Sequence, residues 1–444
     1  MFKIFKKFLC LVVILSMGIL LSACNEPKSE PTATDKTIEA EKKQWIEDID
    51  YLKENLEKSH KNLYHKITKE DLEKQCNDLK KDLNKLSDYQ VKLRLTEIVT
   101  SIGDSHTSLN FKFDEDKAVY PLGVWWFGEE LKVYAADKNQ KDIIGKTLVS
   151  INDIPIDEVM TKINKLVPHE NQQWLKVLNV RYVNMAQLLR ELKITKDNEA
   201  NFTFRDDKGT ESSIPLTARE AELNNLITVK DSYTEKPISA QYDEKDPYWK
   251  LYWYKYIPED KIMYFQYNQC IDRDIARNYG FDNYENLPEF SKFADGLIKE
   301  LNEKEVGKFV IDLRYNTGGN SILMDNFVAK LYDVKKLRSK GKTFVMTGRQ
   351  TFSSGVLACR TLKNSANAIS FGEPTGGNVN GYGDIKMLTL PNSKLQASYS
   401  TKYFDLDSNY KEGFIPDVPV EQSFDNYMKG IDDVYEAVKK YGHQ

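Results

Sequence analysis

Several classes of protein are excluded by what this chain has little of. It has five cysteines in 444 residues, too few for a disulfide scaffold. Lysine and arginine total 63 against 67 acidic residues, so no basic excess is available to neutralise phosphates, and we expect no nucleic-acid partner. The single long apolar run, at the N-terminus, excludes a protein with several membrane spans. With 41% hydrophobic and 11% aromatic residues, the chain can instead form two or three folded domains.

Motifs that bind metals are also missing. The five histidines do not form an HExxH or a paired-histidine pattern, and the cysteines do not form a CxxC motif. We therefore expect neither a metal centre nor any other cofactor. Cys76, Cys270 and Cys359 are widely spaced single cysteines, which is more typical of buried apolar positions than of disulfide partners.

The N-terminus has the features of a secretion signal over residues 1–23. A basic start precedes an apolar run, 8–21, that is short for a membrane span but suits a signal peptide. The sequence Leu-Ser-Ala-Cys resembles the lipobox of bacterial lipoproteins, in which Cys24 would carry the lipid; an ordinary signal cleaved after Ala23 is the alternative. Residues 24–39 are polar and suit a tether. We therefore expect an extracytoplasmic protein anchored to the bacterial cell membrane.

The pattern of apolar residues divides the rest of the chain. Residues 40–113 have helical spacing, whereas 114–220 contain short β-rich runs with one or two helices. In 256–444, strands alternate with helices of 10–15 residues, which is typical of βαβ units and a parallel sheet. Residues 221–255 fit either a linker or an active-site flap. The sequence thus predicts an α/β core that follows a helical segment and a β-rich module.

Two loops at the carboxyl ends of predicted core strands carry unusual residues. Gly318 and Gly319 allow a tight turn with exposed N–H groups before a helix, as in an oxyanion hole, although an ordinary turn would have the same sequence. In the next loop, Ser353 and Ser354 open a helix. Either hydroxyl could be a nucleophile at the top of the sheet or only an N-cap.

A third candidate element is the turn Ile-Gly-Asp-Ser-His-Thr at 102–107, where the helical region ends. His106 differs from the other histidines because Ser105 and Thr107 flank it on a turn that begins with glycine. An imidazole with a pKa near 6.5 can accept a proton at neutral pH. The other histidines are more typical of structural positions: His60, His65, His169 and His443.

Four motifs, GDSHT, DLRYNTGG, TFSSG and FGEPTGG, occur in an order that resembles the tricorn-core and C-terminal-processing serine protease family. The resemblance covers nearly the whole chain after the tether. It implies a crotonase-like α/β protease core over 256–444 and a PDZ-like module over 114–220, where IIGKTLVSINDIPIDEV resembles the PDZ pattern. It also implies a serine peptidase with polypeptide substrates. The sequence leaves the oligomeric state open.

The resemblance also implies roles for individual residues. Ser353, rather than Ser354, matches the nucleophile, and His106 with Ser105 matches the Ser-His pair of the tricorn type. Gly318 or Gly319, together with the N–H of Ser354, matches the oxyanion donors. The implied reaction is acyl transfer to water through a Ser353 acyl-enzyme.

Two positions depart from the family pattern. Asn378 occupies the position of the lysine in the Ser-Lys branch, and a neutral amide cannot accept the serine proton, so His106 is the expected base. The acid that orients the Ser-His pair has no clear counterpart. Ser400 lies near its position, Lys402 lies two residues further, and Asp384 is a weak substitute.

The alternative function is a catalytically inactive surface lipoprotein that keeps the protease fold and binds peptides.

Overall fold

The computed structural model describes residues 33–220 and 226–442. The signal peptide 1–23, Cys24, most of the tether, His443 and residues 221–225 of the linker or flap lie outside the described residues. Helix α1, Ala33–Ser59, begins inside the segment predicted as the tether. No proline follows Pro31 in this stretch, so the helix can start there. None of the helices in the described ranges is long and apolar enough to cross a membrane.

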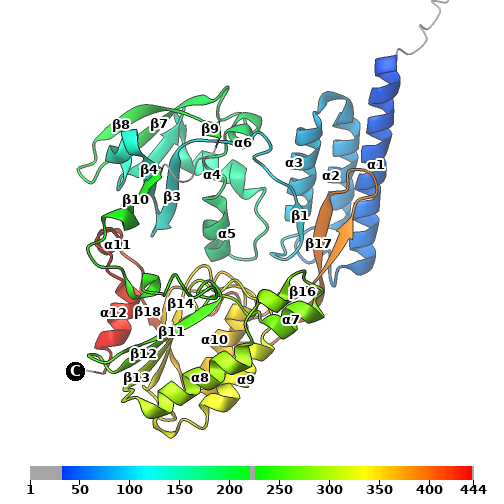
Figure 1. The fold of residues 1–444 in the computed structure, drawn as a ribbon. Helices are drawn as coiled ribbons and strands as arrows, with labels where there is room; N and C mark the ends of the chain where they lie inside the picture. The colour runs from blue at the N-terminus through cyan, green and yellow to red at the C-terminus, as the bar shows by residue number, and fades with distance from the viewer. Residues whose placement is uncertain (1–32, 221–225, 443–444) are drawn as a thin grey trace, which may run out of the picture.

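The N-terminal region is a group of three helices that lie side by side (Figure 1). Helix α1 is followed by α2, Lys69–Asp82, and α3, Asp88–Thr100. Thr68 caps α2, and Ser87 forms a capping box with Gln90 at the start of α3, so both helices begin where the sequence supplies a side-chain acceptor. The predicted helical spacing over this region is confirmed.

The β-rich module is a sheet with strand order β10-β4-β5-β7-β8, to which β3 and β6 are added. Its helices α4, α5 and α6 pack against one core, and α5 points toward the rest of the molecule (Figure 1). Strand β10, in the stretch left open as linker or flap, pairs with β4. The elements are β3 Leu122–Phe127, β4 Glu130–Asp137, β5 Thr147–Ile151, β6 Ile154–Pro155, α4 Ile156–Asn164, α5 Gln172–Asn179, α6 Ala186–Glu191, β7 Glu199–Arg205, β8 Glu211–Thr217 and β10 Leu226–Thr228.

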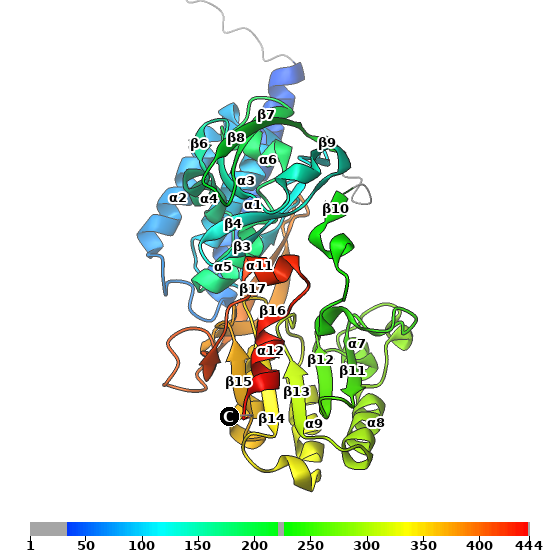
Figure 2. The same cartoon turned by 90° about the vertical axis from the view of Figure 1, so that its left-hand side faces the viewer.

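The core is a sheet of order β11-β12-β13-β14-β15-β18, parallel except for β11. Phe309 and Ile311 of β13 pack with α8, α9 and α10, whereas Val310 packs with α12 on the opposite face. Strand β13 is therefore buried on both faces, and Figure 2 shows α12 in front of the sheet. The elements are β11 Tyr252–Ile257, β12 Ile262–Tyr267, α7 Arg273–Asn278, α8 Phe290–Glu303, β13 Lys308–Asp312, α9 Ile322–Leu331, β14 Thr343–Thr347, α10 Ser354–Ser365, β15 Ile369–Gly372, β18 Val418–Pro419, α11 Phe424–Met428 and α12 Asp433–Lys440.

A hairpin leaves the core and joins the N-terminal helices, an arrangement that the sequence analysis did not predict. Strands β16, Gly381–Thr389, and β17, Gln396–Phe404, form a separate sheet with β1, Ser108–Asn110. Ala397 is fully buried against the helices. Asp48 of α1 accepts hydrogen bonds from the N–H groups at the hairpin tip. The hairpin therefore connects the core to the turn that carries His106. A further short pair is β2, Ala118–Val119, with β9, Arg219–Glu220.

Candidate active site

The glycine pair and Ser353 meet at the carboxyl ends of β13 and β14. Ser353 has φ 51° and ψ −125°, a conformation unusual for a residue with a side chain, directly before α10. A Cβ on Gly318 would lie 2.7 Å from the Cβ of Ser353 and 3.2 Å from its Oγ. Only glycine fits this close approach, so the two loops form one site.

The backbone N–H groups in this site differ in their availability. The Gly318 N–H donates to Oδ1 of Asn316 at 2.9 Å. The Gly319 N–H makes no hydrogen bond within the part of the chain that the structure describes, and Ser354 begins α10, where an N–H has no partner in the helix. Gly319 and Ser354 are therefore the pair of N–H groups that could hold an oxyanion. The Ser354 hydroxyl donates to the Gly319 carbonyl at 2.8 Å, so it fixes the loop.

A buried ion network lies beneath the glycine loop. Arg314 donates to Asp312 at 2.7 Å and to Asp432 at 2.6 Å, and Tyr264 donates to Asp312 at 2.6 Å. The Asp312 side chain is completely buried, and Asp432 caps α12. These contacts tie the loop to the opposite side of the sheet, so Asp312 and Arg314 have a structural role.

His106 lies beside the residue that precedes Ser353. Its ring stacks on Phe352 with centroids 4.7 Å apart, and Phe352 stacks on Trp174 of α5 at 4.0 Å. His106 makes no hydrogen bond to Ser353 among the described residues; such bonds are often long before a substrate binds. Burial lowers the pKa of His106, and the charge of Asp104 and the backbone of Tyr382 oppose this shift. The ring is therefore neutral near pH 7 and able to accept a proton.

Asp104 is a buried carboxylate near His106 that accepts several hydrogen bonds. The sequence analysis missed it, although Asp104 belongs to the GDSHT motif. His60 Nε2 lies 3.1 Å from Asp104 Oδ2, and the N–H of Asn62 donates to His60 Nδ1, which leaves Nε2 as the donor to Asp104. Burial would raise the pKa of Asp104, but hydrogen bonds from His60, Thr107 and the His106 N–H, together with the nearby Ser400 hydroxyl, lower it to about 2. Asp104 is thus a charged carboxylate whose oxygens already accept hydrogen bonds.

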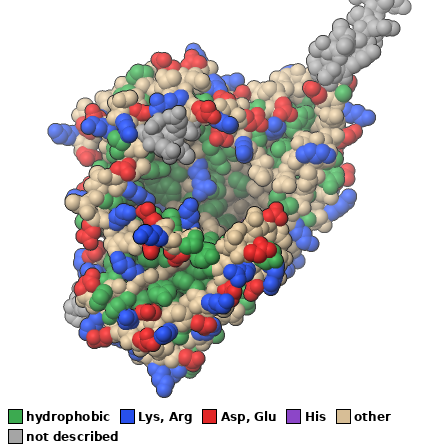
Figure 3. All heavy atoms as spheres, viewed as in Figure 1, with side chains coloured by type: hydrophobic (Ala, Val, Ile, Leu, Met, Phe, Trp, Pro, Cys, Tyr) green, Lys and Arg blue, Asp and Glu red, His purple; other side chains and the backbone are tan. Residues whose placement is uncertain are grey.

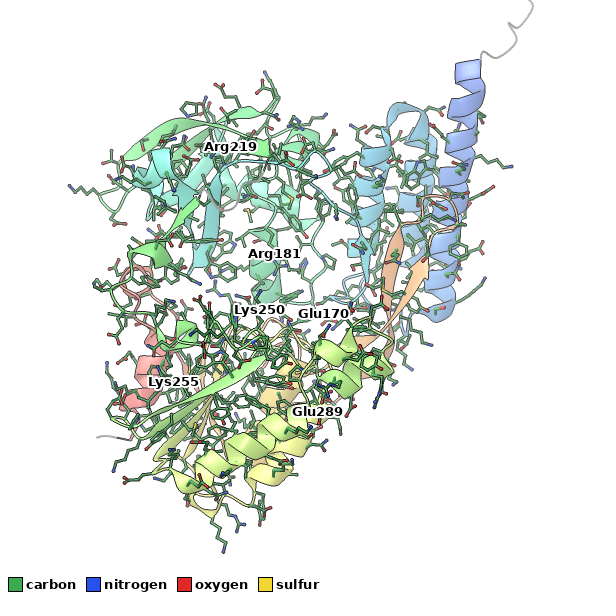
Figure 4. The ribbon with its side chains drawn as sticks, viewed as in Figure 1. Glu170, Arg181, Arg219, Lys250, Lys255 and Glu289 are labelled. Carbon is green, nitrogen blue, oxygen red and sulfur yellow. The ribbon has the colours of Figure 1, made fainter. Side chains whose placement is uncertain are left out.

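Glu170 was also missed, because nothing in the sequence pattern of its loop distinguishes it. It precedes α5 and lies where the module, the core and the β16–β17 hairpin meet (Figure 4). Burial, followed by the charge of Asp104, raises the pKa of Glu170 to about 7, whereas the Tyr382 N–H, Lys66 and Ser105 oppose the rise. A carboxyl group that titrates near neutral pH therefore lies beside Ser105.

The accessory positions fall into two groups. Asn378 accepts a hydrogen bond from Asn171 of the module at 2.8 Å, and its neighbour Gly377 packs against the Ser353 backbone. Ser400 is buried beside Asp104. In contrast, Lys402 and Asp384 form an ion pair of 2.9 Å on the surface of the hairpin. The two side chains are exposed and pair with each other, so the structure does not bring them into the site.

A hollow in the surface separates the module from the core, and hydrophobic side chains gather along it (Figure 3).

Across residues 33–220 and 226–442, no group of three or more His, Cys, Asp or Glu side chains could hold a metal ion. Cys76, Cys270 and Cys359 are buried and free, which confirms their predicted apolar positions.

Comparisons with known proteins bear on this site. Residues 283–420, which include the glycine pair and Ser353, match the model of peptidase family S41. The structure of mature CPAF with lactacystin is similar, with a TM-score of 0.62 and 13% identity over 90% of this chain and 98% of that chain. A second structure of mature CPAF has a TM-score of 0.61 and 12% identity, over 90% and 96%. These likenesses show a shared mixed α/β fold. Among curated proteins, none matches the sequence.

Proposed function

The chain belongs to peptidase family S41, a family of serine proteases, and from this premise we propose that it hydrolyses peptide bonds through an acyl-enzyme on Ser353. His106 is the general base in this proposal. The observation that carries it is the approach of Gly318 to Ser353, which brings the glycine loop against the Ser353 side chain. Ser354 cannot take the same role without giving up its bond to Gly319.

The proposed reaction uses these groups in order. Ser353 Oγ attacks the substrate carbonyl carbon while His106 accepts the hydroxyl proton. The oxyanion is held by the Gly319 and Ser354 N–H groups. The C–N bond then breaks, and the proton passes from His106 to the leaving amine. Water, activated by His106, hydrolyses the ester and restores Ser353.

We also infer that the core is crotonase-like and the module PDZ-like. A PDZ-like module would take an extended peptide by strand addition and pass it along the apolar hollow to Ser353. The separation of the module and the core by that hollow supports this path.

One experiment separates a peptidase from the alternative, an inactive peptide-binding protein, which Asn378 and the missing His106–Ser353 hydrogen bond favour. The chain from residue 25 onward is incubated with denatured casein and, separately, with a fluorophosphonate, which labels only activated serines. We expect cleavage and a single adduct on the peptide that contains Ser353. Casein binding with neither cleavage nor adduct would instead support the binding protein.

The location of the protein is a separate part of the proposal. The lipobox-like sequence supports lipid attachment at Cys24 and substrates that are extracytoplasmic polypeptides. We expect the Cys24→Ser variant to move from the membrane fraction to the soluble fraction, because a lipid chain supplies the membrane affinity. Immunoblotting of fractionated bacterial cells measures this. The Cys10→Ser variant is the control and should stay with membranes; equal distribution of both variants would contradict a lipid anchor at Cys24.

A further inference from the structure

We propose that Glu170 is the acid that positions the catalytic pair, acting on His106 through Ser105. This inference rests on the proposed function and deepens it. It places the acid on the loop of the β-rich module before α5, and not on the strand that follows the FGEPTGG motif. Glu170 touches no reacting atom, so its role is that of a positioning residue.

Two buried polar atoms without partners point to this role. Within the described chain, neither Ser105 Oγ nor His106 Nδ1 makes a hydrogen bond, and both atoms are inaccessible to solvent. An unpaired buried polar group is costly, so such groups mark a site that is completed in another state. The carboxylate of Glu170 lies beside Ser105. In the proposed arrangement, the Ser105 hydroxyl connects the carboxylate to the imidazole.

Asp104, the other carboxylate nearby, is less suited to this role. It lies 3.9 Å from Nδ1 of His106, which is too long for a hydrogen bond. Its oxygens already accept from His60 at 3.1 Å, from the Thr107 hydroxyl and from the His106 N–H at 2.8 Å. Asp104 therefore fixes the backbone of the turn, and Glu170 remains as the acid for its side chains.

The loop that carries Glu170 is held firmly against the site. The N–H of Tyr382 faces Glu170 Oε1 at 3.5 Å, and a Cβ on Gly381 would lie 3.2 Å from Oε2, so a glycine there leaves room for the carboxylate. The next residue, Asn171, bonds Asn378, and Trp174 stacks on Phe352. The module thus contributes a side chain to a site whose nucleophile belongs to the core (Figure 4).

The proposed proton arrangement has a defined pH dependence. In its charged form, Glu170 accepts from the Ser105 O–H, and Ser105 Oγ accepts from His106 Nδ1–H, which directs Nε2 toward Ser353. The pKa of Glu170 is about 7, so this arrangement is lost as the pH falls below neutrality. The titratable and charged groups that face Glu170 are Asp104 on the turn, Lys66 before α2 and Tyr382 on β16.

The test compares Glu170→Gln, which keeps the shape and removes the charge, with Glu158→Gln on the exposed face of α4 as the control. With a fluorogenic casein peptide, we expect Glu170→Gln to lower kcat by about 10- to 100-fold, with KM changed by less than about two-fold. The acidic limb of the pH profile should lose its inflection near pH 7. Glu170→Asp should recover part of kcat, and Glu158→Gln should equal the parent.

A thermal readout separates positioning from a structural role. Because burial raises the pKa of Glu170 from 4.5 to about 7, the folded state is penalised for its charge above pH 7 and not below pH 4.5. Glu170→Gln should therefore raise Tm at pH 8 and leave it nearly unchanged at pH 4.5, while kcat falls. A lower Tm with a raised KM would show a structural role and overturn the inference.

The two proposals fail in different ways. If the parent chain neither cleaves casein nor forms the fluorophosphonate adduct, the peptidase itself is refuted, and the role of Glu170 with it. If the parent cleaves and Glu170→Gln cleaves equally fast with the same pH profile, only the role of Glu170 is refuted.

Discussion

Replacement of Ser353 by alanine is expected to abolish cleavage of denatured casein, with a loss of roughly 10⁴-fold or more in kcat. The variant lacks the oxygen that forms the acyl-enzyme, and no other hydroxyl occupies the strained position before α10. The binding hollow is untouched, so casein binding should persist. Turnover of the parent and the variant is measured with the same labelled casein, and circular dichroism shows whether the variant remains folded.

Ser354→Ala is the matched control, one residue away. Its hydroxyl only donates to the Gly319 carbonyl, and its main-chain N–H is retained. We expect the loss of this bond to lower kcat by about 10-fold or less. A larger loss in Ser354→Ala than in Ser353→Ala would reverse the assignment of the nucleophile.

The largest expected effect on stability belongs to Arg314→Ala. This change leaves the completely buried Asp312 and the nearly buried Asp432 without their cation, and a broken buried pair costs about 3–5 kcal/mol of unfolding free energy. Both carboxylates also keep Arg314 charged: although burial opposes the charge, their influence raises its pKa well above the usual value. Urea denaturation followed by tryptophan fluorescence measures the change.

Arg273→Ala provides the comparison. Arg273 pairs with Glu289 on a partly exposed surface, where an ion pair contributes about 0–1 kcal/mol. Its denaturation midpoint should stay close to that of the parent. Equal destabilisation by the two changes would show that burial does not govern the contribution of the Arg314 network.

Much of the fold was accessible from sequence because local pattern determines it. The alternation of strands and helices over residues 256–444 identified the parallel sheet. The same reasoning placed Gly318 and Ser353 at the carboxyl ends of neighbouring strands, where parallel geometry brings them together. Such inferences need only the order of elements along the chain.

Other features depend on contacts between distant segments, which no local pattern specifies. The hairpin 381–404 has the alternation of an ordinary strand pair, so its partnership with β1 could not be anticipated. Glu170 has no motif around it, and its raised pKa arises only from burial beside Asp104 after folding. The hydrogen bond from the Gly318 N–H to Asn316 leaves the Gly319 N–H as the oxyanion donor. This bond likewise depends on the three-dimensional geometry of the loop.

The hairpin also sets an order of events during synthesis. Ser398 donates a hydrogen bond to the backbone oxygen of His106 at 2.8 Å, and β17 pairs with the strand that follows this turn. The turn with His106 is made early by the ribosome, but its partner strand emerges only near the end of translation. Pairings so distant in sequence form slowly. A nascent chain therefore carries its proposed base in an unfinished turn, and proteolytic competence is delayed until almost the whole polypeptide has been made.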